Sequence, residues 1–94
     1  MTVSRRPPQA KSLARAILQD GEVYYSEPHA LEEMKKDSIT RVDCENVIRG
    51  GAYAEAEWEN GGWRHQVRTG RFVVVIEFLS ETELLIVTAW RLKP

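Results

Sequence analysis

The segment AYAEAEWENGGWRHQVR, residues 52–68, decides the fold, because its side chains alternate in character around a turn signal. Ala54, Ala56 and Trp58 alternate with three glutamates, and this two-residue period predicts a strand with one face in water. Asn60-Gly61 is the dipeptide most typical of a two-residue β-hairpin loop. The segment therefore predicts two antiparallel strands joined at residues 60 and 61.

The register of this hairpin follows from its loop. Counting outward sets four cross-strand pairs: Glu57 with Arg64, Trp58 with Trp63, Ala56 with His65 and Ala54 with Val67. An aromatic pair and a pair of opposite charges fall opposite each other, which is what stabilises neighbouring strands.

The residues that follow extend the hairpin into a sheet. A second tight turn, expected at Thr69-Gly70, sets the next pairs: Val67 with Phe72, His65 with Val74 and Trp63 with Ile76. The chain turns again between Ser80 and Glu83 into Leu84–Arg91, whose apolar residues on both faces are typical of a covered central strand. We expect a four-stranded antiparallel sheet, mainly a meander, between Ala52 and Leu92. Its inner face carries Trp63, Val67, Phe72, Val74, Ile76 and Phe78.

The N-terminal half has the periodicity of helices instead. Residues 9–19 form one amphipathic pattern, which Asp20-Gly21 ends. Ser26 is expected to cap a second helix, with Pro28 in its first turn, that runs to about Lys36. Thr40 and Asp43 have capping-box spacing for a third helix, which Gly50-Gly51 stops. The expected inward side chains are Leu13, Ala14, Ile17 and Leu18 in the first pattern, Ala30, Leu31 and Met34 in the second, and Val42, Val47 and Ile48 in the third.

A chain of 94 residues has room for one modest core. We therefore expect a single α+β domain over residues 9–94, preceded by a flexible N-terminal arm at residues 1–8. Two to three N-terminal helices pack on one face of the four-stranded antiparallel sheet in this prediction.

Composition narrows the classes of function. The net charge of −1 indicates no generally basic surface, so binding of nucleic acid must come from a local arrangement. No apolar stretch has transmembrane length and no apolar segment follows the basic N-terminus, so we expect a cytoplasmic protein with no membrane contact. Cys44 is the single cysteine, which excludes an internal disulfide and favours a small buried side chain.

The sheet face opposite the helices is expected to carry Arg64, Gln66, Arg68 and Arg71 around Val73 and Val75. Guanidinium groups there would hold phosphates bidentately and stabilise the charge of a phosphoryl transition state. Trp90 would stack a base. On the alternative interpretation, Arg64 and Arg68 only balance Glu57 and Glu55 as solvated partners.

His29 and His65 are the two histidines, and either is a candidate general acid or base. The alternatives are a hydrogen bond at a helix start for His29 and a core or edge position for His65. Lys35 and Lys36 either reach RNA or belong to a solvated helix face. No cysteine pair or His-x-x-x-His spacing indicates a metal, and no glycine-rich loop indicates a nucleotide cofactor.

A resemblance to known proteins is carried by five segments: LARAILQDGEVYY (residues 13–25), SEPHALEEM (26–34), ITRVDCENVIRGG (39–51), RTGRFVVVIEF (68–78) and LLIVTAW (84–90). In this order they resemble the MqsR-type mRNA interferase toxins and a related family of small bacterial domains that begin a helix with His-Ala-Leu. The chain departs from the interferases where Arg64 replaces a glutamine and Val73 a tyrosine.

The resemblance implies a RelE-like fold with an RNA site on the open side of the sheet. It also implies endoribonuclease activity without a metal or other cofactor, on free or ribosome-associated RNA, and an antitoxin protein that covers the toxin. The catalytic candidates are His29, Arg64, His65 and Arg68, and the RNA-binding candidates are Lys35, Gln66, Arg71, Trp90 and Arg91. The alternative is a catalytically inactive protein-interaction domain on the same fold, docking through Val73, Val75 and Trp90.

Overall fold

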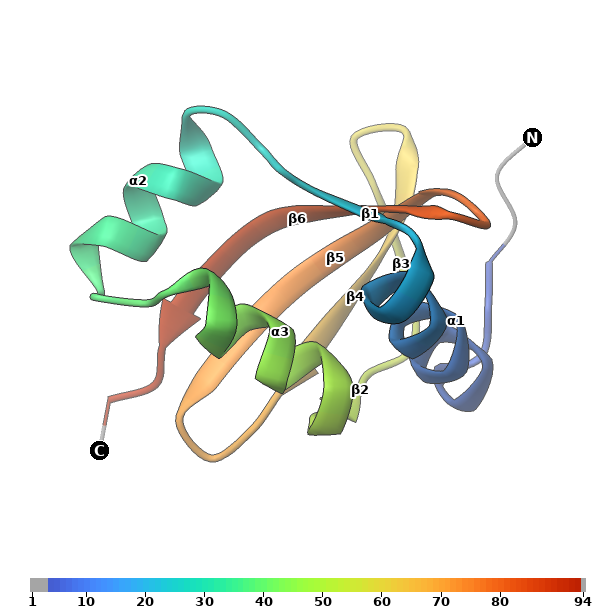
Figure 1. Cartoon of the computed structure of the whole chain (residues 1–94), viewed down its shortest axis with the longest axis horizontal. Coiled ribbons are helices and arrows are strands. Elements are labelled where there is room, and N and C mark those ends of the chain that lie inside the picture. Colours follow the sequence, from blue (N-terminus) through green and yellow to red (C-terminus); the bar gives the residue numbers. More distant parts are fainter. Residues whose placement is uncertain (1–3, 94) are drawn as a thin grey trace.

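The computed structural model describes residues 4–93, and its helices and strands follow the two periodicities of the sequence (Figure 1). The elements are α1 (Pro7–Asp20), β1 (Glu22–Tyr25), α2 (His29–Lys36), α3 (Arg41–Gly50), β2 (Ala52–Tyr53), β3 (Glu57–Glu59), β4 (Gly62–Arg68), β5 (Phe72–Ser80) and β6 (Glu83–Arg91). Helices α1 and α3 lie against one face of the sheet, whereas α2 packs along β6 near its edge. The expected α+β class with N-terminal helices packed on a sheet is confirmed.

The expected four-stranded antiparallel sheet is wrong in strand number and direction. The described residues form a six-stranded mixed sheet with the order β1-β6-β5-β4-β2, in which β3 also pairs with β4. Strand β1 runs parallel to β6, and Val23 lies opposite Leu84. Residues 22–25 are extended in the structure, and their partner comes two helices and four strands later in the chain. Periodicity carries no information about such a pairing. The new pairing places β6 between β1 and β5, as expected of a covered strand.

The expected first strand of the hairpin divides into β2 and β3. The pairs Glu57–Arg64 and Trp58–Trp63 are confirmed. The pairs expected for Ala54 and Ala56 are wrong, because Tyr53 lies opposite Val67 instead. One extra residue between β2 and β3 reverses the alternation of side chains, as in a β-bulge. Tyr53 thereby packs against the core, and its hydroxyl donates a hydrogen bond to the carbonyl oxygen of Ile48 at 2.7 Å.

The register between β4 and β5 differs from the expected one by two residues. Val67 lies opposite Val74 and His65 opposite Ile76, because the turn is centred on Gly70-Arg71. The Thr69 hydroxyl accepts hydrogen bonds from the backbone N–H groups of Arg71 and Phe72, both at 3.2 Å. Thr69 therefore precedes the turn and stabilises it. An even shift leaves each side chain on its expected face.

The core lies between α1, α3 and the inner face of the sheet. It contains the expected strand residues Val67, Phe72, Val74 and Ile76, joined by Leu84, Ile86 and Ala89 of β6. Two expectations are wrong: Val42 is exposed, and Trp63 lies half-buried outside this cluster against the exposed Trp58. Cys44 is fully buried, as expected, and burial raises the pKa of its thiol to about 12.

The helix ends differ in detail from the sequence-based boundaries. Helix α1 begins at Pro7, inside the expected arm, and residues 1–3 of that arm lie outside the described residues. Pro28 rather than Ser26 occupies the N-cap position of α2. The capping box of α3 is confirmed, since Thr40 and Asp43 exchange hydrogen bonds of 2.9 and 3.0 Å. Within residues 4–93, no helix is long and apolar enough to cross a membrane.

Candidate functional site

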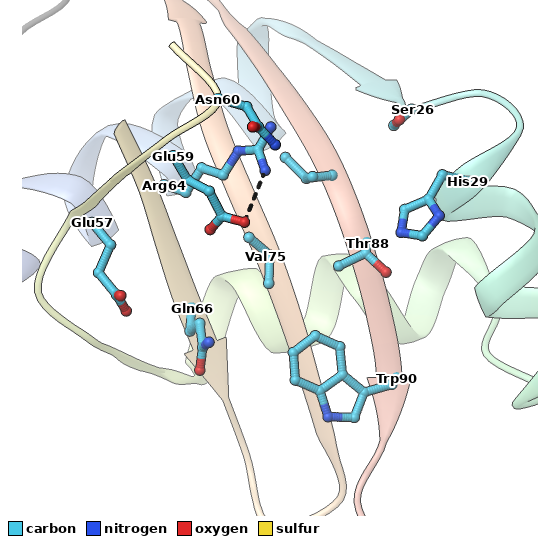
Figure 2. A pocket seen from close by; sticks show the side chains of 11 residues that line it. Ser26, His29, Glu57, Glu59, Asn60, Arg64, Gln66, Val75, Thr88 and Trp90 are labelled. Atoms are coloured by element: carbon cyan, nitrogen blue, oxygen red, sulfur yellow. Dashed lines mark ion pairs between the residues drawn. The ribbon is translucent and has the colours of Figure 1, made fainter. Parts of the chain in front are cut away.

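A groove of about 460 Å³ lies on the sheet face opposite α1 and α3 (Figure 2). It crosses β4, β5 and β6 between the β3–β4 hairpin on one side and the start of α2 on the other. Its lining combines amide, hydroxyl, carboxylate, guanidinium, imidazole and indole groups with two aliphatic side chains: Ser26, His29, Glu57, Glu59, Asn60, Arg64, Gln66, Val75, Val87, Thr88 and Trp90.

The floor of the groove is a row of cross-strand neighbours. Gln66 of β4 lies opposite Val75 of β5, and Val75 lies opposite Thr88 of β6. Trp90 follows Thr88 on the same face and lies opposite Val73. Val73 is fully buried and Val75 nearly so. The docking surface expected at Val73, Val75 and Trp90 is therefore wrong, because two of its three side chains have almost no exposed area.

The hairpin wall is acidic, and its arginine is tied to two carboxylates. The Arg64 Nε donates to Glu77 Oε1 at 3.2 Å, and its Nη1 lies 3.7 Å from Glu59 Oε1. These partners replace Glu57, which the cross-strand register alone had indicated. The side chains of Arg64 and Glu77 are only 17% and 20% exposed. Arg64 is thus held in place with its charge compensated. The sequence had instead predicted a guanidinium that is free to bind phosphate.

Gly62 makes room for this ion pair. A Cβ atom at position 62 would lie 2.5 Å from Glu77 Oε1, so a side chain there would displace the carboxylate. The second glycine of the Asn-Gly-Gly turn therefore has a steric reason that is separate from the turn. The turn itself has a positive φ at Asn60 (48°) and Gly61 (84°), as a type I′ loop requires.

His29 supplies the opposite wall. It is the first residue of α2, and its exposed ring lies beside Thr88, across the groove from Glu57 and Arg64 (Figure 2). Among the described residues, no group forms a hydrogen bond or ion pair with the ring, so the expected alternative of a helix-start hydrogen bond is not seen. Its imidazole is available to a ligand.

His65 is excluded from this groove. It lies on the inner face, almost fully buried, where Nδ1 donates to the carbonyl oxygen of Ala54 at 3.0 Å. The rings of Tyr53 and Phe78 lie 6.3 and 6.1 Å away between centroids. The structure therefore places His65 where the alternative interpretation has it, as a hydrogen-bonded core histidine, and not beside the other catalytic candidates.

Two of the predicted RNA-binding residues lie elsewhere. The Arg91 guanidinium donates to the carbonyl oxygens of Asp37 and Ser38, at 3.1 and 3.2 Å, and so fastens β6 to the connection between α2 and α3. Lys35 lines a separate hollow on the outer side of α2. Neither side chain lines the groove.

The remaining predicted arginines lie near the β4–β5 turn. Arg68 follows Gln66 on the same face of β4 and lies opposite Val73, in the row that ends at Trp90. Arg71 lies in the turn itself, and its guanidinium lies 5.7 Å over the ring of Phe72, a core residue on the helix side. Both arginine side chains are exposed. The open face therefore has one exposed arginine, Arg68, at this turn and an acidic wall at the β3–β4 hairpin.

Sequence reasoning missed some groove residues for identifiable reasons. The sequence marks Asn60 only as a turn residue and Ser26 only as a helix cap. Ser26 reaches the groove because β1 pairs with β6, and its N–H donates to the carbonyl oxygen of Ile86 at 2.9 Å. The two-residue period of β6 does connect Thr88 with Trp90, and it is the one sequence signal that extends the site.

Comparison of the chain with family models, with curated proteins and with solved structures finds no match in any of the three. The resemblance to MqsR-type toxins stays a prediction from the sequence. Within residues 4–93, no three His, Cys, Asp or Glu side chains come together as metal ligands.

Proposed function

We propose that the groove binds single-stranded RNA and cleaves it without a metal, as a toxin-like endoribonuclease whose antitoxin restrains it. The observation that carries the proposal is the single groove that gathers an unpartnered imidazole, an indole ring and several hydrogen-bonding groups: His29, Trp90, Gln66 and Thr88. These are the groups that recognise unstacked RNA bases and the 2′-hydroxyl. Such a function belongs in the cytoplasm, on free or ribosome-associated mRNA.

The charges of the open face suggest how a strand of RNA would lie. Phosphates belong beside the exposed Arg68, because Glu57 and Glu59 repel them from the hairpin wall. A base would stack on Trp90, with its edge toward the Gln66 amide. The groove therefore favours a base inside it and the backbone away from the hairpin wall, between Arg68 and His29.

The proposed chemistry is transfer of the phosphoryl group to the neighbouring 2′-oxygen. The O2′–P bond forms and the P–O5′ bond breaks, while a base takes the 2′-hydroxyl proton and an acid protonates the departing 5′-oxygen. The His29 imidazole carries one of these protons. Water carries the other proton, because Glu57 lies across the groove from His29, in the acidic wall that repels phosphate.

Cleavage of a single-stranded RNA by the purified protein in EDTA, with and without ribosomes, tests the proposal. Replacing His29 with Ala should lower the rate by roughly 10²- to 10⁴-fold, the range of one general acid or base. Trp90→Ala should weaken RNA binding by roughly 5- to 150-fold, because stacking contributes about 1–3 kcal/mol per base.

The matched control for charge is a pair of exposed arginines. Arg68→Ala should weaken RNA binding, whereas Arg49→Ala, on the helical side beside Arg15, should not. Equal effects would place the RNA outside the groove. Intact RNA in both conditions, together with harmless expression in cells, would refute the nuclease function.

An inactive protein-interaction domain is the second candidate, and the tying of Arg64 to Glu59 and Glu77 favours it. A compensated guanidinium and an acidic wall suit a cationic or neutral ligand better than a polyanion. On this alternative the protein binds a partner stably, and His29→Ala leaves that binding unchanged.

A further inference from the structure

Strand β3 forms an exposed edge of the sheet beside the groove. It pairs with β4 only, and all three of its residues, Glu57, Trp58 and Glu59, are exposed. Trp58 is 56% exposed, which is unusual for so large an apolar side chain. The second tryptophan of the hairpin, Trp63, lies behind it at 5.3 Å between ring centroids and 71° between planes. This edge-to-face contact with Trp63 fixes the orientation of the exposed Trp58 ring.

The backbone of Trp58 is free to pair with another strand. Glu59 and Gly62 close the two-residue loop, so they form the hydrogen-bonded pair of the hairpin. Trp58 and Trp63 are then a non-hydrogen-bonded pair, and the N–H and C=O of Trp58 point away from β4. An unpaired edge of this kind is a template for an added strand.

Charge decides which strand fits. Glu57 and Glu59 flank Trp58 on the groove side, and Glu55 precedes them, so the segment 55–59 holds three negative charges and no positive one. A second copy of this edge would bring glutamates against glutamates, which is unfavourable. Residues opposite each other on neighbouring strands share a face. A complementary strand therefore places an apolar residue beside Trp58 and basic residues beside Glu57 and Glu59.

We propose that β3 is the docking edge for an extended segment of a partner protein with the alternating pattern basic–apolar–basic. The segment adds to the sheet through the Trp58 backbone, covers the indole ring and neutralises the glutamates. The docked strand shares Glu57 and Glu59 with the groove wall but does not use His29, Gln66 or Trp90, so its binding can be measured independently of RNA cleavage.

The probe is a capped hexapeptide of alternating Lys and Val, titrated into the full-length protein and followed by tryptophan fluorescence and calorimetry. Two peptides are controls: three lysines followed by three valines, which keeps the composition, and alternating Glu and Val, which keeps the pattern. The alternating basic peptide should bind at least about tenfold more tightly than either control. Equal binding of the three peptides would overturn the proposal.

Variants locate the binding on the structure. Trp58→Ala should weaken binding of the alternating Lys-Val peptide by about tenfold or more. Tyr24→Ala removes the exposed aromatic residue of β1, at the other edge of the sheet, and should leave binding unchanged. Circular dichroism confirms that both variants fold. An equal loss in Tyr24→Ala, or a dimer of the protein alone that Trp58→Ala abolishes, would contradict a basic partner at β3. RNA cleavage is measured without peptide, so failure of one proposal leaves the other standing.

Discussion

Removing the charge of Glu77 tests how Arg64 is held in the wall of the groove. Glu77→Gln keeps the size of the side chain but leaves Arg64 with Glu59 alone, at 3.7 Å and with 61% of the Glu59 side chain exposed. A hydrogen bond to a charged group contributes roughly 1.5–3 kcal/mol, and the partial exposure of both partners reduces this. We expect the free energy of unfolding to fall by about 1–2 kcal/mol, or the melting temperature by roughly 5–15 °C.

Glu59→Gln is the matched control, because it removes the other carboxylate from the same guanidinium. Its ion pair is long and largely solvated, so the expected cost is at most about 0.5 kcal/mol. Urea unfolding followed by far-ultraviolet circular dichroism measures both variants at neutral pH. If Glu59→Gln costs as much as Glu77→Gln, or if Glu77→Gln is neutral, then Glu77 is not the partner that fixes Arg64.

Three further predictions concern the core and its caps. Gly51→Ala should lower the free energy of unfolding by about 2–3 kcal/mol in urea, because the new Cβ would lie 2.6 Å from the Val47 carbonyl oxygen. At Gly50 the new Cβ would meet no atom within 4 Å, so Gly50→Ala should be neutral or slightly stabilising. Similar values for both variants would contradict the packing of α3 on β4. Burial raises the pKa of the Cys44 thiol to about 12. At pH 8 this thiol should therefore react with iodoacetamide at least about 100-fold more slowly in the native protein than in the urea-unfolded protein. Rapid labelling of the native protein would show that the core is open. The backbone N–H of Thr40 lowers the pKa of Asp43 from its ordinary 3.8, so its stabilisation is present above that pH and lost as pH falls through the native value. The stability difference between wild type and Asp43→Asn should therefore shrink in acid, and a constant difference would count against the capping box.

Local signals predicted local structure. Asn60-Gly61 contains its own register information, since a two-residue loop leaves one way to pair Trp58 with Trp63. The capping box at Thr40 and Asp43 likewise depends on residues three apart. The helical and strand periods indicated which faces are buried, and the core strand residues Val67, Val74 and Ile76 agree.

Non-local pairings were beyond reach of the same signals. The extra residue before β3 turns Tyr53 instead of Ala54 toward the core, and burying the larger ring stabilises the fold more than burying a methyl group would. No pattern in residues 52–57 indicates this choice. The position of β1 beside β6 depends on contacts between the two ends of the chain. That pairing carries Ser26 and His29 to the groove, so the sequence could name a histidine but could not choose His29 over His65.

Binding of RNA in the open-face groove is tested most directly by backbone and indole NMR shifts of the ¹⁵N-labelled protein during titration with a short single-stranded RNA. The proposed function predicts that the largest shifts fall on the Trp90 indole N–H, the Gln66 side-chain amide and the backbone of Thr88 and His29, with the α1–α3 surface unchanged. Shifts concentrated on that helical surface near Arg15 and Arg49, or no shifts at millimolar RNA, would contradict it.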